Sequence, residues 1–192
     1  MRNLIVILML AGAIVRAGSR DGENAGRSVT VCMQDLPARG DVRLAQWAAS
    51  QIFAEIGVTL RWYGIRQCPS EDAILVILST ETRADLTPGV LAYAMPYEGH
   101  HIVVYLDRIT GLADSRPRFL FGYVLAHEIA HILEGFNGHS DTGIMKASWN
   151  SADFGEMGRR RLRFSESDIC LIHAPPPETG PGVRVLAARR RD

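Results

Sequence analysis

Two histidines four residues apart, with a glutamate directly after the first, form the most chemically informative pattern in this 192-residue sequence. The pattern places His127 and His131 on the same face of a helix, one turn apart. Two imidazole nitrogens on one helix face can bind a single Zn²⁺, and Glu128 beside them is a candidate general base. We therefore predict that this stretch belongs to a catalytic zinc site.

A third zinc ligand has to come from outside the helix, so the chain must turn back after it. Gly135 predicts the end of the helix, and His139 follows four residues later. Catalytic zinc sites commonly use three protein ligands and leave a fourth position for water. We predict His139 as the third ligand because of its ligand type, with Asp141 as the alternative. Glu134 is poorly placed, since it is still on the helix.

The pattern resembles that of the metzincin group of zinc endopeptidases, H-E-x-x-H-x-x-G-x-x-H followed by a methionine-containing turn. The resemblance implies that His127, His131 and His139 bind one catalytic Zn²⁺ and that Glu128 is the general base. It also implies that Met145, in a Gly-Ile-Met sequence, forms an apolar floor beneath the ligands. The implied reaction is hydrolysis of peptide bonds in a peptide or protein substrate by a zinc-activated water.

The sequence departs from the metzincin pattern in the spacing of the third ligand. In the metzincin pattern, the glycine lies three residues after the second histidine, and the last histidine lies six residues after the second histidine. In this sequence, Gly135 lies four residues after His131 and His139 lies eight residues after His131. The segment between the second and third ligands is therefore two residues longer than in the metzincin pattern. A longer loop around a glycine can still bring His139 to the metal.

Two other functions are compatible with the motif. One is a non-catalytic zinc-binding or partner-binding protein with a metzincin-like fold. Structural zinc sites normally have four protein ligands and no use for a glutamate base, which favours catalysis. The other is a zinc hydrolase that acts on a non-peptide amide, which the motif alone does not distinguish from a peptidase.

The order of the elements before the motif also resembles that of metzincins, and the resemblance implies an α+β, zincin/metzincin-like domain over residues 28–173. It has a mixed, twisted sheet of four to five strands, the active-site helix and a short C-terminal helix. Apolar periodicity and turn residues place strands at 29–34, 58–63, 73–78, 90–95 and 102–106, and helices at 41–56, about 115–134 and 165–172. Ser115 is the expected cap of the second helix, and Ser165 and Asp168 are spaced like a capping box at the start of the third. We expect residues 73–78 to be buried on both faces. The resemblance to metzincins further implies that the 91–95 strand or its 102–106 partner forms the edge that pairs with extended substrate.

The two ends of the sequence have a different composition. Residues 1–17 combine Arg2, an apolar run and small residues near position 17, which predicts a signal peptide and a secreted or periplasmic protein. The run is too short to span a membrane, so we expect no membrane association after cleavage. The mature chain would then have a net charge of −2, which argues against nucleic-acid partners. Residues 174–192 are rich in Pro, Gly and Arg and predict a disordered tail.

Three cysteines and a run of arginines remain to be interpreted. In an exported protein we expect a Cys32–Cys68 disulfide, because both residues flank predicted strands, with Cys170 left over. The alternative is three buried thiols. The arginines at 159–163 are interpreted as a solvated face, with recognition of acidic substrates as the less favoured alternative. The sequence does not predict the oligomeric state.

Overall fold

The computed structural model describes residues 26–34, 40–95, 100–112 and 117–175, in which five strands form one mixed sheet. The predicted signal peptide (1–17), the turn at 96–99 and all but two residues of the predicted tail lie outside these ranges. The strand order is β2-β1-β3-β5-β4. The strands are β1 (Arg27–Met33), β2 (Val58–Gly64), β3 (Ile74–Ser79), β4 (Ala92–Met95) and β5 (His101–Tyr105). All neighbours pair in parallel except β4, which is antiparallel to β5 and forms one edge.

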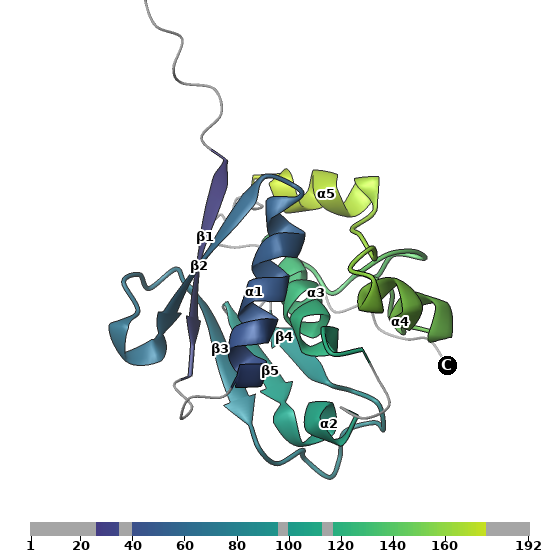
Figure 1. The fold of residues 1–192 in the computed structure, drawn as a ribbon. Coiled ribbons are helices and arrows are strands. Elements are labelled where there is room, and N and C mark those ends of the chain that lie inside the picture. Colours follow the sequence, from purple (N-terminus) through teal and green to yellow (C-terminus); the bar gives the residue numbers. More distant parts are fainter. Residues whose placement is uncertain (1–25, 35–39, 96–99, 113–116, 176–192) are drawn as a thin grey trace, which may run out of the picture.

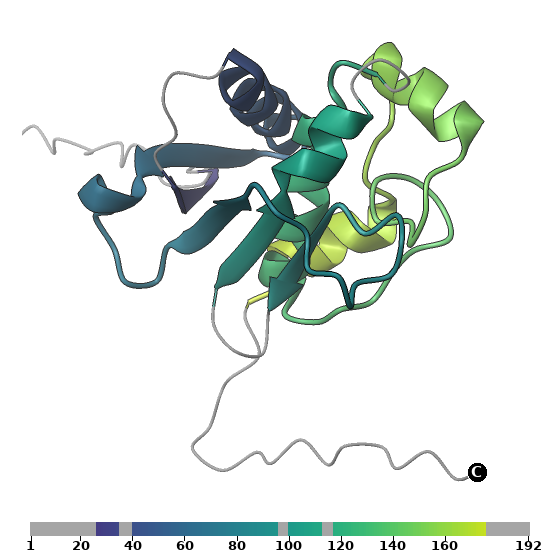
Figure 2. The same ribbon diagram turned by 90° about the horizontal axis from the view of Figure 1, so that it is seen from below.

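Two long helices cover one face of this sheet. They are α1 (Gly40–Ala54), which contacts β2, and α3 (Leu120–Glu134), which contacts β4 and β5. The view from below shows both helices on the same side of the strands (Figure 2). The shorter elements are a 3₁₀ turn η1 (Ile65–Gln67) and helices α2 (Leu106–Gly111), α4 (Ser151–Gly158) and α5 (Glu166–His173) (Figure 1). The predicted mixed sheet with a short C-terminal helix is therefore confirmed.

The structure corrects three details of the predicted elements. Helices α2 and α4 were not expected, although Asn150 and Asp153 form a capping box at the start of α4. Helix α3 begins at Leu120, after Pro117, whose carbonyl accepts a hydrogen bond from the Leu120 N–H at 2.8 Å. The expected cap Ser115 lies outside the described residues. Strand β3 is central, but its burial alternates along the strand, so only one face is fully covered.

The contact between α1 and α3 depends on small residues. A Cβ added to Gly122 of α3 would lie 2.5 Å from the Cβ of Ala48 and 3.1 Å from the carbonyl oxygen of Ala45 on α1. Real Cβ atoms do not approach other atoms so closely, so a larger residue at 122 would push the helices apart. The close approach of α1 fixes the position of α3 over β4 and β5.

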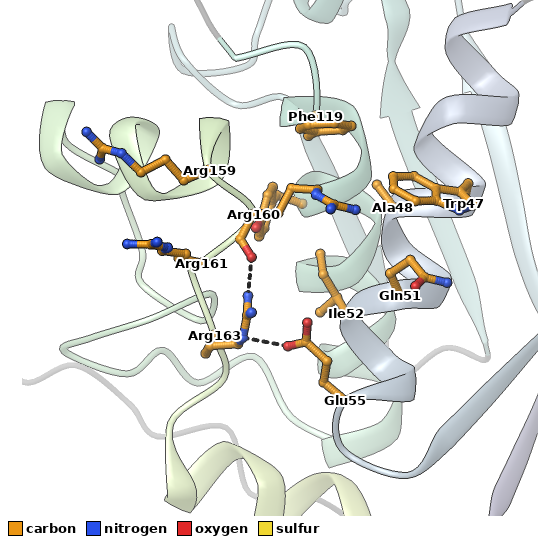
Figure 3. A pocket seen from close by; sticks show the side chains of 11 residues that line it. Trp47, Ala48, Gln51, Ile52, Glu55, Phe119, Arg159, Arg160, Arg161 and Arg163 are labelled. Atoms are coloured by element: carbon orange, nitrogen blue, oxygen red, sulfur yellow. Dashed lines mark hydrogen bonds and ion pairs between the residues drawn. The ribbon is translucent and has the colours of Figure 1, made fainter.

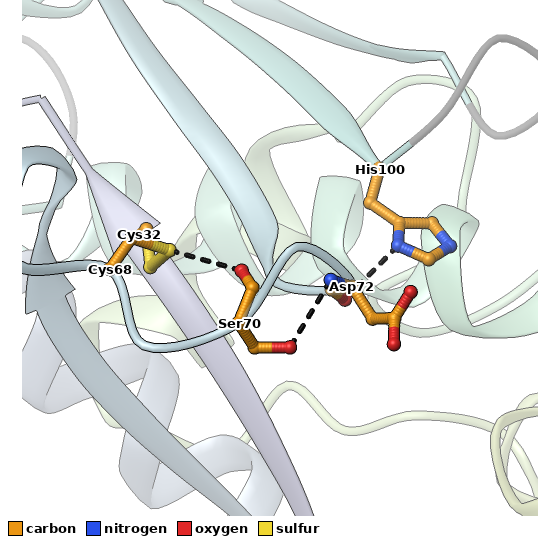
Figure 4. Close-up of a disulfide and its surroundings, with 5 residues drawn as sticks. All are labelled: Cys32, Cys68, Ser70, Asp72 and His100. Carbon is orange, nitrogen blue, oxygen red and sulfur yellow. Dashed lines mark hydrogen bonds between the residues drawn. A yellow bond between two sulfur atoms is a disulfide. The ribbon is translucent and has the colours of Figure 1, made fainter.

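A disulfide links the sheet to the segment after β2, as expected. Cys32 of β1 and Cys68, which follows η1, are joined with their Cα atoms 5.6 Å apart (Figure 4). Nearby, the His100 Nδ1 lies 3.1 Å from the Asp72 carbonyl oxygen. Cys170 is free and exposed. Cross-linking residues separated by 36 positions restricts the unfolded chain and by the loop-entropy relation contributes about 3 to 4 kcal/mol to stability.

None of the helices in the described part of the chain combines the length and the apolar character needed to cross a bilayer.

We predict that Gly122→Ala lowers the free energy of unfolding by about 1 to 3 kcal/mol, because overpacking between α1 and α3 outweighs the better helix propensity of alanine. Denaturant unfolding measures the loss. In an Ala48→Gly background, which removes the clashing Cβ, the same substitution should cost clearly less. Equal costs in the two backgrounds would contradict the proposed contact.

Candidate metal centre

Helix α3 carries three of the predicted site residues in a nearly fully buried setting. His127, Glu128 and His131 are 8%, 7% and 4% exposed, among apolar neighbours on the same helix. The helix ends at Gly135, which has a left-handed conformation (φ 75°) and donates its N–H to the His131 carbonyl at 3.0 Å. The glycine predicted as the helix stop is therefore confirmed, and the chain leaves the helix one turn after His131.

The three predicted ligand histidines converge. One nitrogen from each of His127, His131 and His139 lies within 4.8 Å of the other two. The Nε2 atoms of His127 and His131 are 3.0 Å apart, and the His139 ring centroid lies 5.3 Å and 5.0 Å from the rings of His127 and His131. The lengthened loop thus delivers His139 to the other two histidines.

The hydrogen bonds of the two helical histidines fit a metal ion. The Nδ1 of His127 lies 2.9 Å from the Ile144 carbonyl oxygen, and the Nδ1 of His131 lies 3.2 Å from the Phe136 carbonyl oxygen. A carbonyl can only accept, so each Nδ1 carries the hydrogen and each Nε2 keeps its lone pair. This is the usual arrangement for zinc-ligating histidines. Burial lowers the pKa of both rings to about 4, so both are neutral at pH 7, as ligation requires.

Glu128 lies next to this cluster and is held by the edge strand. The backbone N–H of Ala94 on β4 donates a hydrogen bond to its carboxylate. Burial nevertheless raises the pKa of Glu128 to about 8, and the hydrogen bond from Ala94 opposes this shift. A carboxyl group with a pKa near neutral can both accept and release a proton.

The cluster opens into a cleft of about 740 Å³ between α3 and the edge strand. The three histidines and Glu128 form part of its wall. Further lining comes from the segment Pro88–Ala94, the apolar face of α3, and the residues Lys146, Ala147, Ser148 and Trp149. The site is therefore accessible to a ligand much larger than water.

Strand β4 presents unpaired backbone groups on its outer side. The Tyr105 N–H donates to the Leu91 carbonyl at 2.9 Å, so residues 91, 93 and 95 are the ones that exchange hydrogen bonds with β5. Ala92 and Ala94 alternate with them, and their N–H and C=O groups point away from β5. The Ala94 N–H reaches Glu128, which shows that this outer side faces α3 and the cleft. As expected, the 91–95 strand is an edge.

The loop that carries His139 is anchored at several points. Ser140 donates its N–H to the Met145 carbonyl at 2.8 Å and its hydroxyl to the Oδ1 of Asp168, which is 2% exposed on α5. The Asp168 Oδ2 accepts the Ser165 N–H at 2.9 Å. The His139 ring itself makes no hydrogen bond to any described residue, so its position depends on Ser140.

Glycine is required at one further point of this loop. Gly143 has φ 76°, and a Cβ there would lie 2.4 Å from the Arg163 carbonyl oxygen. The next residue, Ile144, donates its N–H to the same oxygen at 2.9 Å. Because the Ile144 carbonyl accepts from His127, the segment before α5 positions both the loop and a ligand.

The other predicted site residues are placed as follows. Met145 is 1% exposed within the core, beside Ile144. Asp141, the alternative ligand, is exposed and does not belong to the histidine cluster. Glu134 is not part of the cluster either. The sequence predicts a capping role for Asp168, and no local pattern indicates its bond to Ser140.

Glu134 has an unusual environment beside Asp168. Its Oε1 atom is buried and, within the described residues, has no hydrogen-bond partner. Burial raises the pKa of Glu134 to about 7, and the negative charge of Asp168 adds to this shift. The ionised form of Glu134 is therefore disfavoured in the folded protein.

Comparisons with known proteins add one likeness. No protein-family model matches the sequence, and no curated protein matches it. Among solved structures, the chain is similar to the crystal structure of archaemetzincin from Methanopyrus kandleri. The two share 16% sequence identity over 79% of this chain and 96% of archaemetzincin, with a TM-score of 0.46.

We predict that Ser140→Ala and Asp168→Asn each weaken zinc binding about tenfold or more, because loss of their hydrogen bond frees the loop that carries His139. Competition with a chromophoric chelator measures the affinity. Ser167→Ala, which alters an exposed hydroxyl on the same helix, is the control and should bind zinc like the unmodified protein. Unchanged affinity in both test variants would show that the loop does not need this anchor.

We predict that Glu134 by itself destabilises the metal-free protein increasingly as the pH rises from about 4.5 to about 7, because folded Glu134 binds its proton more tightly than unfolded Glu134 does. Glu134→Gln should remove this component and raise the melting temperature more at pH 8 than at pH 5. Thermal unfolding at both pH values tests this, with Glu71→Gln, an exposed site, as control. An equal effect of Glu134→Gln at the two pH values would contradict the prediction.

Proposed function

We propose that this protein is an exported zinc-dependent endopeptidase with a zincin/metzincin-like fold. The observation that carries the proposal is the convergence of His127, His131 and His139 beside Glu128 in an open cleft. The neutral rings of His127 and His131, each with an Nε2 lone pair free of backbone partners, suit Zn²⁺, and three protein ligands are typical of catalytic zinc. Export is proposed from the signal-like composition of residues 1–17.

The proposed mechanism assigns one task to each group. Bound zinc would polarise the scissile carbonyl and lower the pKa of the attacking water. The Glu128 carboxylate accepts the proton of that water and delivers it to the leaving amine. The hydrogen bond from the Ala94 N–H keeps the carboxylate oriented during both transfers. His127 and His131 remain neutral, and each Nδ1–H stays with its carbonyl partner.

The edge strand supports a peptide as the substrate. The outward N–H and C=O groups of Ala92 and the C=O of Ala94 offer an extended chain the hydrogen bonds of one further strand. The same strand holds Glu128 through the Ala94 N–H, so a peptide bound to β4 would lie beside the base. A compact non-peptide amide would use none of these backbone groups.

A purely structural zinc site fits the cleft less well. Such sites normally have four protein ligands and exclude solvent. The cluster in the described part of the chain contains three residues, and it lines a cleft of about 740 Å³. Catalysis therefore remains the proposed role of the site.

We predict that Glu128→Gln lowers kcat for peptide cleavage by about 10²- to 10⁴-fold while zinc content stays the same, because the amide cannot accept the proton. A fluorogenic peptide library and metal analysis of the purified protein measure the two quantities. Glu166→Gln, at an exposed position on α5, is the control and should leave cleavage unchanged.

Two results would contradict the proposed function. One is cleavage by Glu128→Gln at the normal rate. The other is cleavage that persists after a chelator has removed the metal. If the Glu128→Gln variant also loses zinc, Glu128→Asp replaces it as the test variant, because aspartate keeps the negative charge but moves the carboxylate away from its original position.

A further inference from the structure

A second cavity lies beside the start of α3, separate from the histidine cleft. It has a volume of about 360 Å³ and is bounded by α1, the start of α3 and the segment that follows α4 (Figure 3). Its main lining residues are Trp47, Glu55, Phe119, Tyr123, Arg160 and Arg163. It shares no lining residue with the histidine cleft. A ligand bound here would therefore not touch the candidate metal centre.

The lining has an excess of positive charge. It contains four arginines, including Arg159 and Arg161, and Glu55 as its one acidic residue. Arg163 pairs with Glu55, with 2.5 Å between Nε and Oε2, and it also donates to the Arg160 carbonyl at 2.5 Å. Arg160 has no carboxylate partner among the described residues. The cavity is therefore electrostatically suited to an anion.

Arg160 occupies a backbone position where glycine is usual. Its φ is 58°, in the left-handed region. Its N–H donates to the Met157 carbonyl at 2.9 Å and the N–H of Arg161 donates to the Glu156 carbonyl at 2.8 Å, which are the two bonds of a Schellman motif at the end of α4. A glycine would make the same turn with less strain. The arginine at this position therefore contributes through its side chain.

That side chain faces two aromatic rings at the cavity. The guanidinium carbon of Arg160 lies 5.2 Å from the Trp47 ring centroid and 5.9 Å from that of Phe119. Figure 3 shows Arg160 extending toward Trp47, whereas Arg159 and Arg161 extend the other way. The stacking holds the charge of Arg160 in place and leaves its N–H groups available.

A buried hydroxyl also opens on to this cavity. Tyr123 is 1% exposed and lines the cavity, and within the described residues its hydroxyl has no hydrogen-bond partner. Burial raises its pKa, so the hydroxyl keeps its proton and can donate it. Among the described residues, Glu134 Oε1 is the one fully buried side-chain polar atom without a partner, so the Tyr123 hydroxyl keeps some accessible surface at the cavity and can donate to a bound acceptor there.

We propose that this cavity binds a small organic anion through a carboxylate or phosphate group. The anionic group accepts a hydrogen bond from the Tyr123 hydroxyl and lies against the guanidinium groups of Arg160 and Arg163. An apolar, planar body attached to it lies on the exposed part of Trp47, which is 42% accessible. The proposal is independent of the zinc-dependent activity.

The three tryptophan side chains provide separate reporters for the test. Trp47 belongs to this cavity, whereas the indole N–H of Trp149 donates to the Ile144 carbonyl beside the histidines at 3.1 Å. The indole N–H of Trp62 donates to Ser50 at 2.8 Å and reports on neither site. Inorganic phosphate or benzoate is titrated into ¹⁵N-labelled, zinc-free protein, with chloride keeping the ionic strength constant.

We expect the Trp47 indole signal to shift saturably with at least one probe, while the Trp62 and Trp149 signals stay fixed. The probe that binds more tightly identifies the preferred anionic group. An unmoved Trp47 signal with both probes overturns the proposal. A shift of Trp149 in place of Trp47 also overturns it, since the anion then lies at the histidines.

Two variants assign the binding to the named groups. Tyr123→Phe removes one hydroxyl that has no partner among the described residues, and it should weaken binding about tenfold. Arg160→Gly keeps the left-handed turn without strain, so it should fold normally and also bind at least tenfold more weakly. Arg61→Ala, at an exposed position on β2, is the control and should bind like the unmodified protein. Unchanged affinity in both test variants overturns the proposal.

Discussion

The burial of α3 is the constraint on which the rest of the molecule depends. This helix packs against α1, the sheet and α5, yet the imidazoles of His127 and His131 and the carboxyl group of Glu128 are buried on it. Buried polar groups are costly unless they are hydrogen-bonded. Each of the three is satisfied from a different segment: His127 by Ile144, His131 by Phe136 and Glu128 by Ala94. The hydrogen bonds to these three side chains therefore also hold the loop and the edge strand in place around α3.

The same hydrogen bonds decide which atoms remain available for chemistry. Each helical histidine uses Nδ1 for a carbonyl, so Nε2 is left free and faces the position where His139 arrives. The carboxylate of Glu128 is tied to the strand that can pair with an extended chain. Stability and chemistry thus depend on the same few contacts, and the site does not require a separate set of supporting residues.

The parts of the fold that could be predicted are those with a local signal in the sequence. The spacing of His127 and His131, the stop at Gly135 and the capping box at Ser165 each depend on a few neighbouring residues, and the structure has all three elements where they were expected. Apolar periodicity likewise located all five strands. Helices α2 and α4, with six and eight residues, are too short for such a pattern to stand out.

The parts that could not be predicted depend on contacts between distant segments. The acceptors of the histidine N–H groups are backbone carbonyls, and any residue type at Phe136 or Ile144 could supply them. The bond between Ser140 and Asp168 joins residues 28 positions apart. The burial of one face of β3 depends on which helices cover the sheet, and the apolar run itself did not distinguish one covered face from two.

The placement of Gly135 and Gly143 has a consequence for how such a site can change over evolution or by design. Both glycines have a left-handed backbone conformation. Gly135 ends α3 and Gly143 lies against the Arg163 carbonyl, so the loop between them is held in position at both ends. Residues can be inserted or deleted between Phe136 and His139 while His131, Ser140 and Ile144 keep their partners. The length of this loop can therefore change while His139 keeps its position. New sequence can be inserted there at the rim of the cleft.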